Sequence, residues 1–481
     1  MLALVLSLDE YARLAVDQAL RVGADYAEGR VQRNTGGTYT LKNGSAEPVT
    51  VNRKLGVGIR VIVNGALGFA STNNLEKDDI RTMAESAVRT AKASGRLLTN
   101  PIRLSSEKSW EDNWVAKMKV DVRKVSPEDK FELLFTIEKS LAQENVHVSL
   151  PSRIVIFDED LTEKFYVNSE GARLHGFVPR LSLLYILTAV EPGKGTAQRI
   201  RHEAQSRGWE VVEDWNPKDI AAEEAKMMGR SLREGIEAPK GDVDFVLGPE
   251  VTGIICHESC GHPQEADRIL GREAAQAGES YVKPNMIGHR IGSEHVTIID
   301  DPTLPNSYGF YMYDDEGVKA RPRTLIKEGV IADFLHNRET AAELKVTSNG
   351  ASRASSYDRE PIIRMGNTFM KTGDHSLGEL LEGVKRGVYM RSFMEWNIDD
   401  RRYNQRYVGL EAYMIENGEI TTPVRNPILE ITTPGLYGSV DAVGKELAFS
   451  GATCGKGDPM QGAPVWTGGP AIRLRQVKVG A

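Results

Sequence analysis

Residues 253–268, GIICHESCGHPQEADR, constrain the fold more than any other segment of this chain. They follow Pro249 and Glu250, which suit the first turn of a helix. At about 100° per residue, Glu258 and His262 fall on the apolar stripe of that helix. A carboxylate and an imidazole therefore point inward. Because buried polar groups need partners, the segment must contain a charge network or a metal.

The spacing of the two histidines in this segment is unusual. His257 and His262 are five residues apart, one more than in the zinc-peptidase signature H-E-x-x-H. A regular α-helix would separate their side chains by about 140°, too far for both to reach one ion. A one-residue π-bulge would restore a shared face, and such bulges are frequent at functional sites. Gly261 tolerates unusual dihedrals and Pro263 lacks a backbone N–H, so we predict a π-bulge here.

The residue types favour zinc chemistry. Two neutral imidazoles and one further protein ligand can hold Zn2+ and leave a position for a water whose pKa falls toward ~7. Glu258 would take the proton of the attacking water and pass it to the leaving amine. The third ligand is Cys454 in SGATCGKGDP or Cys260 within the motif, and we favour Cys454. Without a metal, the alternative is a buried Glu258–His262 ion pair with His257 at the surface.

A second segment, GASRASSYDREPIIRMGNT at residues 350–368, is rich in arginines, hydroxyls and small side chains. One interpretation is an ordinary solvent-exposed loop. The other is a substrate-binding segment in which Arg353, Arg359 or Arg364 holds a peptide carboxylate in bidentate fashion.

Local patterns predict an α+β fold. Ser7 precedes a helical pattern over residues 8–22, and Asn64-Gly65 is typical of a type I′ turn between two strands. RIVIFD, KFYVNSEGARLHG and RLSLLYILTAVE suggest three strands of a meander. We expect an N-terminal α+β region at residues 1–236, subdivided near 100–125, that provides the substrate cleft and the dimerisation surface. A β-rich metallopeptidase domain at residues 237–481 would carry the HExxxH helix.

Composition narrows the class of partner and the compartment. A net charge of −7 over 481 residues, without a long basic run, argues against a nucleic-acid binder. The longest strongly apolar stretch, LSLLYILTAV, is half of what a membrane span needs. Three cysteines favour a reducing compartment, and the start of the chain lacks the features of a signal peptide. We therefore expect a cytoplasmic protein that binds neither nucleic acid nor membrane.

The chain resembles the TldD/PmbA family of metallopeptidases. The family pattern is H-E-x-x-x-H followed almost two hundred residues later by a cysteine in a glycine-containing loop. Here these are His257, Glu258, His262 and Cys454. The blocks DDEGVKARPR, NRETA, GASRA and MGNT also resemble the family's C-terminal half, in the same order.

The resemblance implies a zinc peptidase that acts on short or unfolded peptides. It also implies a homodimer, or a heterodimer with a related subunit that lacks the metal motif, with this chain as the catalytic, TldD-like subunit. Cys256 and Cys260 are not ligands in the family pattern. Two other hypotheses remain: a non-catalytic peptide-binding or scaffold subunit with a structural metal, and a cysteine hydrolase that uses Cys256 or Cys260.

Overall fold

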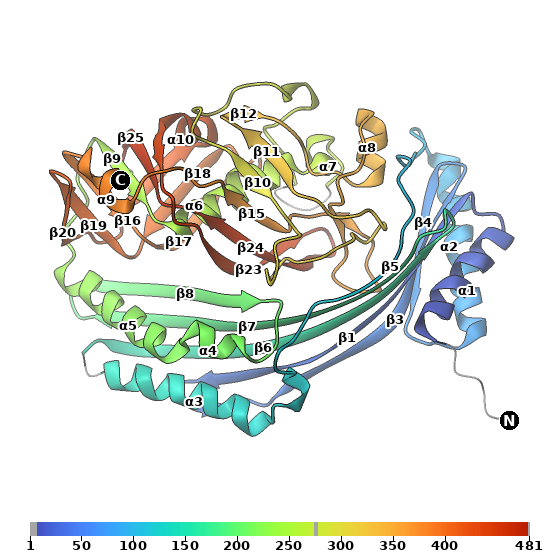
Figure 1. The fold of residues 1–481 in the computed structure, drawn as a ribbon, viewed down its shortest axis with the longest axis horizontal. Helices are drawn as coiled ribbons and strands as arrows, with labels where there is room; N and C mark the ends of the chain where they lie inside the picture. Colours follow the sequence, from blue (N-terminus) through green and yellow to red (C-terminus); the bar gives the residue numbers. More distant parts are fainter. Residues whose placement is uncertain (1–6, 146, 274–277, 480–481) are drawn as a thin grey trace.

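The computed structural model describes residues 7–145, 147–273 and 278–479. One long, curved sheet forms the N-terminal half, and the C-terminal half lies against its concave face (Figure 1). The sheet has the order β4-β3-β1-β6-β7, with β5 and β8 on the free edge of β7 and β2 beside β1, and only β5 is parallel to its neighbour. Its strands are β1 (Tyr26–Lys42), β2 (Ser45–Ala46), β3 (Thr50–Val63), β4 (Ala66–Thr72), β5 (Glu111–Val115), β6 (Ser149–Asn168), β7 (Arg173–Glu191) and β8 (Gly195–Gln205).

Two turns in this sheet differ in how well local sequence patterns predict them. The predicted type I′ turn is confirmed, since Asn64 and Gly65 have φ of 49° and 77° and connect β3 to β4. The predicted three-stranded meander is wrong, because β6 and β7 are two strands of 20 and 19 residues joined by one turn. That turn lies inside the segment KFYVNSEGARLHG, where Gly171 has φ of 99°.

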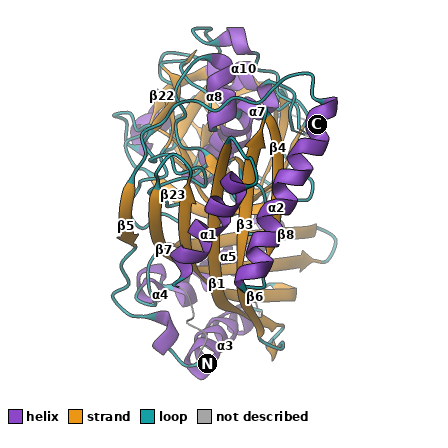
Figure 2. Cartoon of the chain, turned by 90° about the vertical axis from the view of Figure 1, so that its right-hand side faces the viewer, coloured by secondary structure: helices purple, strands orange, loops and turns teal. Residues whose placement is uncertain are grey.

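Two groups of helices cover the outer face of the long sheet. The first two helices lie over one end of it, where alanines and valines form a separate core (Figure 2). The predicted helix after Ser7 is confirmed, with a capping box between Ser7 and Glu10. No helix in the described part of the chain is long and apolar enough to cross a membrane. The helices are α1 (Leu8–Arg21), α2 (Lys77–Ser94), α3 (Pro127–Glu144), α4 (Val211–Trp215) and α5 (Pro217–Glu234).

The C-terminal half contains two six-stranded sheets. The first has the order β12-β11-β10-β15-β24-β23 and the second β20-β19-β16-β9-β25-β22. The first comprises β10 (Ile298–Asp300), β11 (Arg323–Lys327), β12 (Val330–Ile331), β15 (Asn367–Met370), β23 (Ala448–Lys456) and β24 (Gln461–Gly469). The second comprises β9 (Asp242–Leu247), β16 (Arg386–Met390), β19 (Ala412–Glu416), β20 (Glu419–Pro423), β22 (Val440–Val443) and β25 (Ile472–Lys478).

Smaller elements complete this half and confirm the predicted α+β fold class. A three-stranded sheet has the order β17-β18-β21, and β13 pairs with β14. These strands are β13 (Ser352–Arg353), β14 (Ile362–Ile363), β17 (Phe393–Ile398), β18 (Asn404–Gly409) and β21 (Ile428–Thr432). The helices are α6 (Pro249–Cys256), α7 (Ala266–Ile269), α8 (Arg338–Leu344), α9 (Leu377–Glu382) and α10 (Thr433–Ser439).

Helix α6 is held in the core between the two large sheets. It follows β9 of the second sheet directly and packs against β15, β23 and β24 of the first. Gly253 permits the close approach to β24, because a Cβ atom there would lie 2.9 Å from the backbone carbon of Thr467. Val251 and Ile255 are fully buried in the same core. This packing fixes the C-terminal end of α6 beside strand β23.

Candidate metal centre

The two histidines of the motif face each other because the helix changes its geometry between them. After Cys256 the chain forms a π-helical turn, His257–Gly261, and then a short 3-10 turn that begins at His262. The ring centroids of His257 and His262 are 4.9 Å apart, with an angle of 78° between the planes. The predicted π-bulge is confirmed, and it removes the rotation that a regular α-helix would impose.

The role of Gly261 differs from the one we predicted. Its φ of −55° is ordinary helical backbone, so it does not serve an unusual dihedral. A Cβ atom at this position would instead lie 1.8 Å from the Sδ atom of Met365. Packing against Met365, which is 1% exposed, is therefore what requires a glycine here.

Strand β23 brings a third potential ligand to the two histidines. The ligand atoms of His257, His262 and Cys454 all lie within 4.8 Å of one another. Cys454 Sγ is 3.4 Å from Nε2 of His262. All three side chains are buried, with 4%, 3% and 7% of their surface exposed. Two nitrogens and one sulfur at this separation suit a tetrahedral zinc with three protein ligands and one open position.

The polar atoms of this trio fit a metal ion better than they fit each other. Nδ1 of His257 is buried and has no hydrogen-bond partner. Burial would raise the pKa of Cys454, but His262 and His257 outweigh it and hold the pKa well below its ordinary value. Burial would lower the pKa of His257, but charge interactions, chiefly with Cys454, are together larger than the effect of burial, so the pKa of His257 is raised. A thiolate between two imidazoles is a donor set that a divalent ion would satisfy.

A carboxylate that the sequence analysis missed orients His262. Nδ1 of His262 lies 3.0 Å from Oε2 of Glu265, which leaves Nε2 facing Cys454. Arg268 and Lys456 also contact this carboxylate, at 2.7 and 3.2 Å. Burial would raise the pKa of Glu265, but Lys456, His262 and Arg268 hold it well below its usual range. Metal-binding histidines commonly donate their second N–H to such a carboxylate, and the i,i+3 spacing was the available signal.

Glu258 lies beside the trio and binds two residues from another sheet. Trp396 Nε1 donates to Oε1 at 3.3 Å, and Arg402 Nη1 donates to Oε2 at 2.5 Å. Trp396 is in β17, and Arg402 is in the turn from β17 to β18 with φ of 63°. Neither residue could be found from the sequence, because no local pattern connects either of them to Glu258.

The metal-free arrangement that we considered is wrong in both of its parts. His257 is 4% exposed and does not lie at the surface. His262 pairs with Glu265, and Glu258 pairs with Arg402. Cys260 is fully buried in the hydrophobic core and lies outside the trio.

The cysteines of the motif also lack the environment of a nucleophile. Cys256 and Cys260 are both fully buried. Burial raises the pKa of each thiol, and no cation contacts either of them among the hydrogen bonds and ion pairs of the described residues. A reactive cysteine needs a lowered pKa and access, so this geometry does not favour the cysteine-hydrolase hypothesis.

The arginines of residues 350–368 are not in a solvent-exposed loop. Arg353 and Arg364 are 8% and 1% exposed, in and beside the small β13–β14 pair. Arg364 holds the hairpin of the third ligand, because it donates to the carbonyl oxygens of Cys454 and Gln461. Arg359 is half-buried and pairs with Asp358. The three arginines therefore do not form one cluster.

An apolar cavity opens beside the trio. Its volume is about 290 Å3, and its walls include Ile254 of α6, Trp396 of β17, and Phe449 and Thr453 of β23. Trp396 also donates to Glu258, so one wall residue of the cavity contacts that carboxylate. Strand β23 is an edge strand of its sheet, with β24 as its one neighbour there.

Fold and site together define a class of protein: an α+β chain with a buried two-histidine, one-cysteine candidate metal centre beside a carboxylate. The chain belongs to the PmbA/TldA metallopeptidase family. The C-terminal domain of that family matches residues 240–481, its domain 1 matches residues 27–91, and its central domain matches residues 121–232.

Named relatives agree with this membership. A metalloprotease of Methanocaldococcus jannaschii is 32% identical, and the match covers 95% of this chain and 97% of that protein. A zinc metalloprotease TldD homolog of Saccharolobus solfataricus is 29% identical over 97% of this chain and 98% of its own. The crystal structure of TldE from Thermococcus kodakarensis covers 98% of this chain and 100% of its own, with a TM-score of 0.75 and 17% identity. At that identity the likeness shows the fold alone.

Proposed function

We propose that this chain is a zinc-dependent peptidase that hydrolyses peptide bonds in short or unfolded peptides. His257, His262 and Cys454 would hold the ion, and Glu258 would act as the general base. The observation that carries the proposal is the approach of the three potential ligand atoms to within 4.8 Å of one another, with Glu258 directly after His257 on the π-helical turn. The name of the zinc metalloprotease TldD homolog supports the choice of metal.

The proposed reaction divides into the chemistry of the ion and the chemistry of this chain. A bound zinc ion supplies Lewis-acid activation of water and of the peptide carbonyl. Glu258 accepts the proton of the attacking water and delivers it to the departing amine nitrogen. Arg402 and Trp396 hold the Glu258 carboxylate in place by hydrogen bonds. Each carboxylate oxygen has two lone pairs, so Oε1, which accepts one weak bond from Trp396, keeps one free for that proton.

The depth of the site suggests which substrates can reach it. The proposed ligands are at most 7% exposed, so a folded protein surface cannot contact them. A flexible peptide can enter the apolar cavity, which is lined by Trp396 and by residues of β8 and β23. The same substrate class, short or unfolded peptides, follows from the family resemblance.

A second candidate is a peptide-binding or scaffold subunit in which the metal only stabilises the domain. The ion pair between Arg402 and Glu258 favours it, because a carboxylate neutralised by a guanidinium is a weaker base.

We also propose that the protein is a homodimer or pairs with a related subunit, supported by the shared fold of TldE. A cytoplasmic location is supported by the three cysteines, none of which forms a disulfide bond.

One experiment separates the two candidates. Metal content and cleavage of an unfolded peptide are measured for the wild type, the chelated wild type and Glu258→Gln. We expect about one zinc per chain, no cleavage after chelation, and a loss of about 10²- to 10⁴-fold in kcat for Glu258→Gln with its zinc retained. Glu395→Gln on β17, exposed to solvent, is the matched control and should stay active. Full activity of Glu258→Gln contradicts the peptidase mechanism, and zinc without cleavage by any form favours the scaffold.

A further inference from the structure

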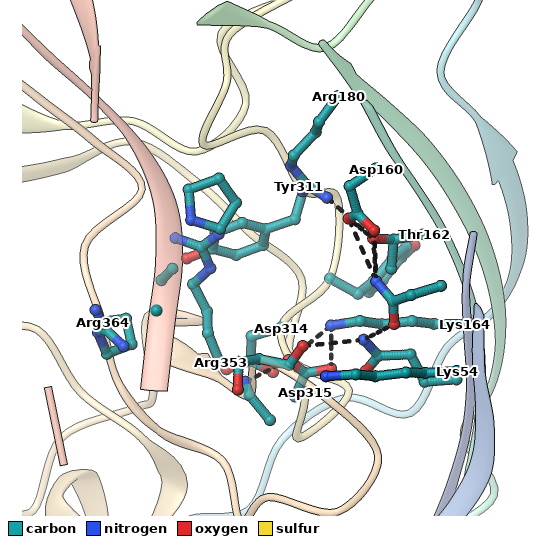
Figure 3. A pocket seen from close by; sticks show the side chains of 18 of the residues that line it. Lys54, Asp160, Thr162, Lys164, Arg180, Tyr311, Asp314, Asp315, Arg353 and Arg364 are labelled. Carbon is teal, nitrogen blue, oxygen red and sulfur yellow. Dashed lines mark hydrogen bonds and ion pairs between the residues drawn. The ribbon is translucent and has the colours of Figure 1, made fainter. Parts of the chain in front are cut away.

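A second, strongly polar cavity lies between the long sheet and the C-terminal half (Figure 3). Its volume is about 240 Å3, room for about eight water molecules. It is lined by β1, β3, β6 and β7 of the long sheet on one side and by β13, β24 and neighbouring loops on the other. We call it the arginine cavity, and its cations are Lys54, Lys164, Arg180, Arg353 and Arg364.

The carboxylates of the arginine cavity are fewer than its cations and are already engaged. They are Asp160, Asp314 and Asp315. Asp315 binds Lys164 at 2.8 and 2.9 Å, accepts from the backbone N–H of Ala354, and lies 3.7 Å from Arg30. Asp160 accepts hydrogen bonds from Asn34 and Thr162. Asp314 accepts backbone N–H groups, and burial raises its pKa well above the ordinary value. These contacts leave a positive excess.

The three guanidinium groups of the arginine cavity bind backbone carbonyl oxygens. Nε of Arg180 donates to Tyr308 at 3.0 Å, and Nη1 of Arg353 donates to Met365 at 2.6 Å. Within the described ranges, Arg180, Arg353 and Arg364 form no ion pair with a carboxylate. Nε of Arg364 is buried and has no hydrogen-bond partner. Asp160 and Asp315 act on Arg180 from a distance and oppose the effect of its burial, but three carboxylates face five cations. Buried cations in excess of their counter-ions are costly, so the site would be stabilised by an anion.

Electrostatics agrees with this geometry. Burial lowers the pKa of Arg353 to about 10, and Arg180 and Arg364 add to the decrease by repulsion. Burial also lowers the pKa of Arg180. Both side chains are at most 9% exposed, so solvent does not screen them well. The guanidinium of Arg353 lies 5.1 Å from the ring centroid of Tyr311, which fixes its orientation in the cavity.

We propose that the arginine cavity is a carboxylate-binding site for the peptide substrate. The carboxylate is the α-carboxylate at the C-terminus of a peptide or the side chain of an aspartate or glutamate. Guanidinium groups bind carboxylates by short, charge-assisted hydrogen bonds. The volume is below the range of about 300–1,000 Å3 typical of small-molecule pockets, so the cavity suits one small charged group.

The position of the arginine cavity relates it to the proposed metal centre. Ala463 lines the cavity and is the cross-strand partner of Cys454, and such partners are about 5 Å apart at Cα. Arg364 lines the same cavity and binds the carbonyl oxygen of Cys454. A peptide anchored here would thus be held close to the strand that carries the third proposed ligand. As a substrate site, the cavity rests on the proposed function.

The first test needs no change to the cavity. Zinc-loaded Glu258→Gln protein is titrated calorimetrically with three alanine–glycine hexapeptides: a free acid, its C-terminal amide, and an amide with one internal glutamate. We expect the plain amide to bind about ten- to a hundredfold more weakly than the free acid. Restored binding by the glutamate peptide identifies an acidic side chain as the ligand, and its failure identifies the C-terminus. Equal binding of all three peptides overturns the proposal.

The second test assigns the effect to Arg353. Arg353→Met should remove the difference between acid and amide, while Arg353→Lys should keep part of it. Arg290→Met is the control, because Arg290 also donates to backbone carbonyl oxygens and lies outside the cavity. An undiminished difference in folded Arg353→Met overturns the proposal. If that variant does not fold, the peptide comparison above still decides.

Binding and turnover can fail separately in these tests. Cleavage by the wild type with equal binding of acid and amide would leave the peptidase standing and remove the carboxylate site. Selective binding of the free acid without cleavage by the wild type would support the carboxylate site and contradict the peptidase function.

Discussion

The candidate metal centre and a buried ion network elsewhere in the chain bury charge in opposite ways. In the network, Arg60 of β3 binds Glu28 of β1 and Glu316 of the C-terminal half, each at 2.7 Å. Glu28 also accepts from Tyr26 and Tyr166, so both of its oxygens have partners. In the metal centre, Nδ1 of His257 has no hydrogen-bond partner, and the two histidines hold the pKa of Cys454 well below its ordinary value.

The difference separates architecture from chemistry. The Arg60 network links β1 and β3 to the C-terminal half, and every charge in it has a partner within the chain. The metal centre instead gathers three potential ligand atoms around one point and leaves Nδ1 of His257 without a partner. The arginine cavity carries a positive excess, because five cations and three carboxylates line it. Stability therefore depends on the closed network, and binding is expected where the chain leaves its charges open.

The largest effect that would sharpen this comparison is on stability. Arg60→Met removes the central cation and leaves Glu28 and Glu316 buried without it. We expect unfolding to become easier by about 3–5 kcal/mol, with zinc content unchanged in the protein that remains folded. Denaturant unfolding and elemental analysis measure the two quantities. A variant that loses zinc while keeping its stability would contradict the separation of the two regions.

The next effect is on metal affinity. Glu265→Gln keeps the shape of the side chain but removes the charge that orients His262. We expect zinc to bind about 10- to 100-fold more weakly, as measured by competition with a chelator of known affinity. Asp267→Asn is the control, since Asp267 shares Lys456 with Glu265, whereas within the described residues it forms no hydrogen bond with His262. Equal loss in both variants would show that only the lysine matters.

The smallest effect concerns the π-helical turn, where fold and site meet. Gly261→Ala places a methyl group on the Sδ atom of Met365. Because methionine is flexible, we expect a cost of about 1–2 kcal/mol in the free energy of unfolding. Zinc affinity should fall as well, since the turn sets the spacing of the two imidazoles. If the clash with Met365 is the cause, the double variant Gly261→Ala, Met365→Ala should recover the zinc affinity. If it does not, the loss comes from a change in the backbone of the turn.

Much of the local structure could be predicted from short stretches of sequence. The helix after Ser7, the Asn64-Gly65 turn and the π-helical turn each depend on residues that are neighbours in the chain. Errors arose where burial depends on distant segments. Residues 350–368 look like a surface loop by composition, yet Arg353 and Arg364 are enclosed by β24 and the long sheet. The meander is a different kind of error. Residues 153–191 form two long strands and not three, and their one turn lies inside a segment that we predicted to be a single strand.

The sequence by itself determined the candidate ligands and the irregular helix that presents His257 and His262 together, because these follow from residue type and spacing. Only the tertiary structure decided that Cys454, and not Cys260, completes the trio, and that Arg402 and Trp396 hold Glu258. It also decided that three arginines without carboxylate partners surround one small cavity. The physical reason is that a buried charge is stabilised by whatever group packing brings within a few ångströms, and packing joins segments hundreds of residues apart.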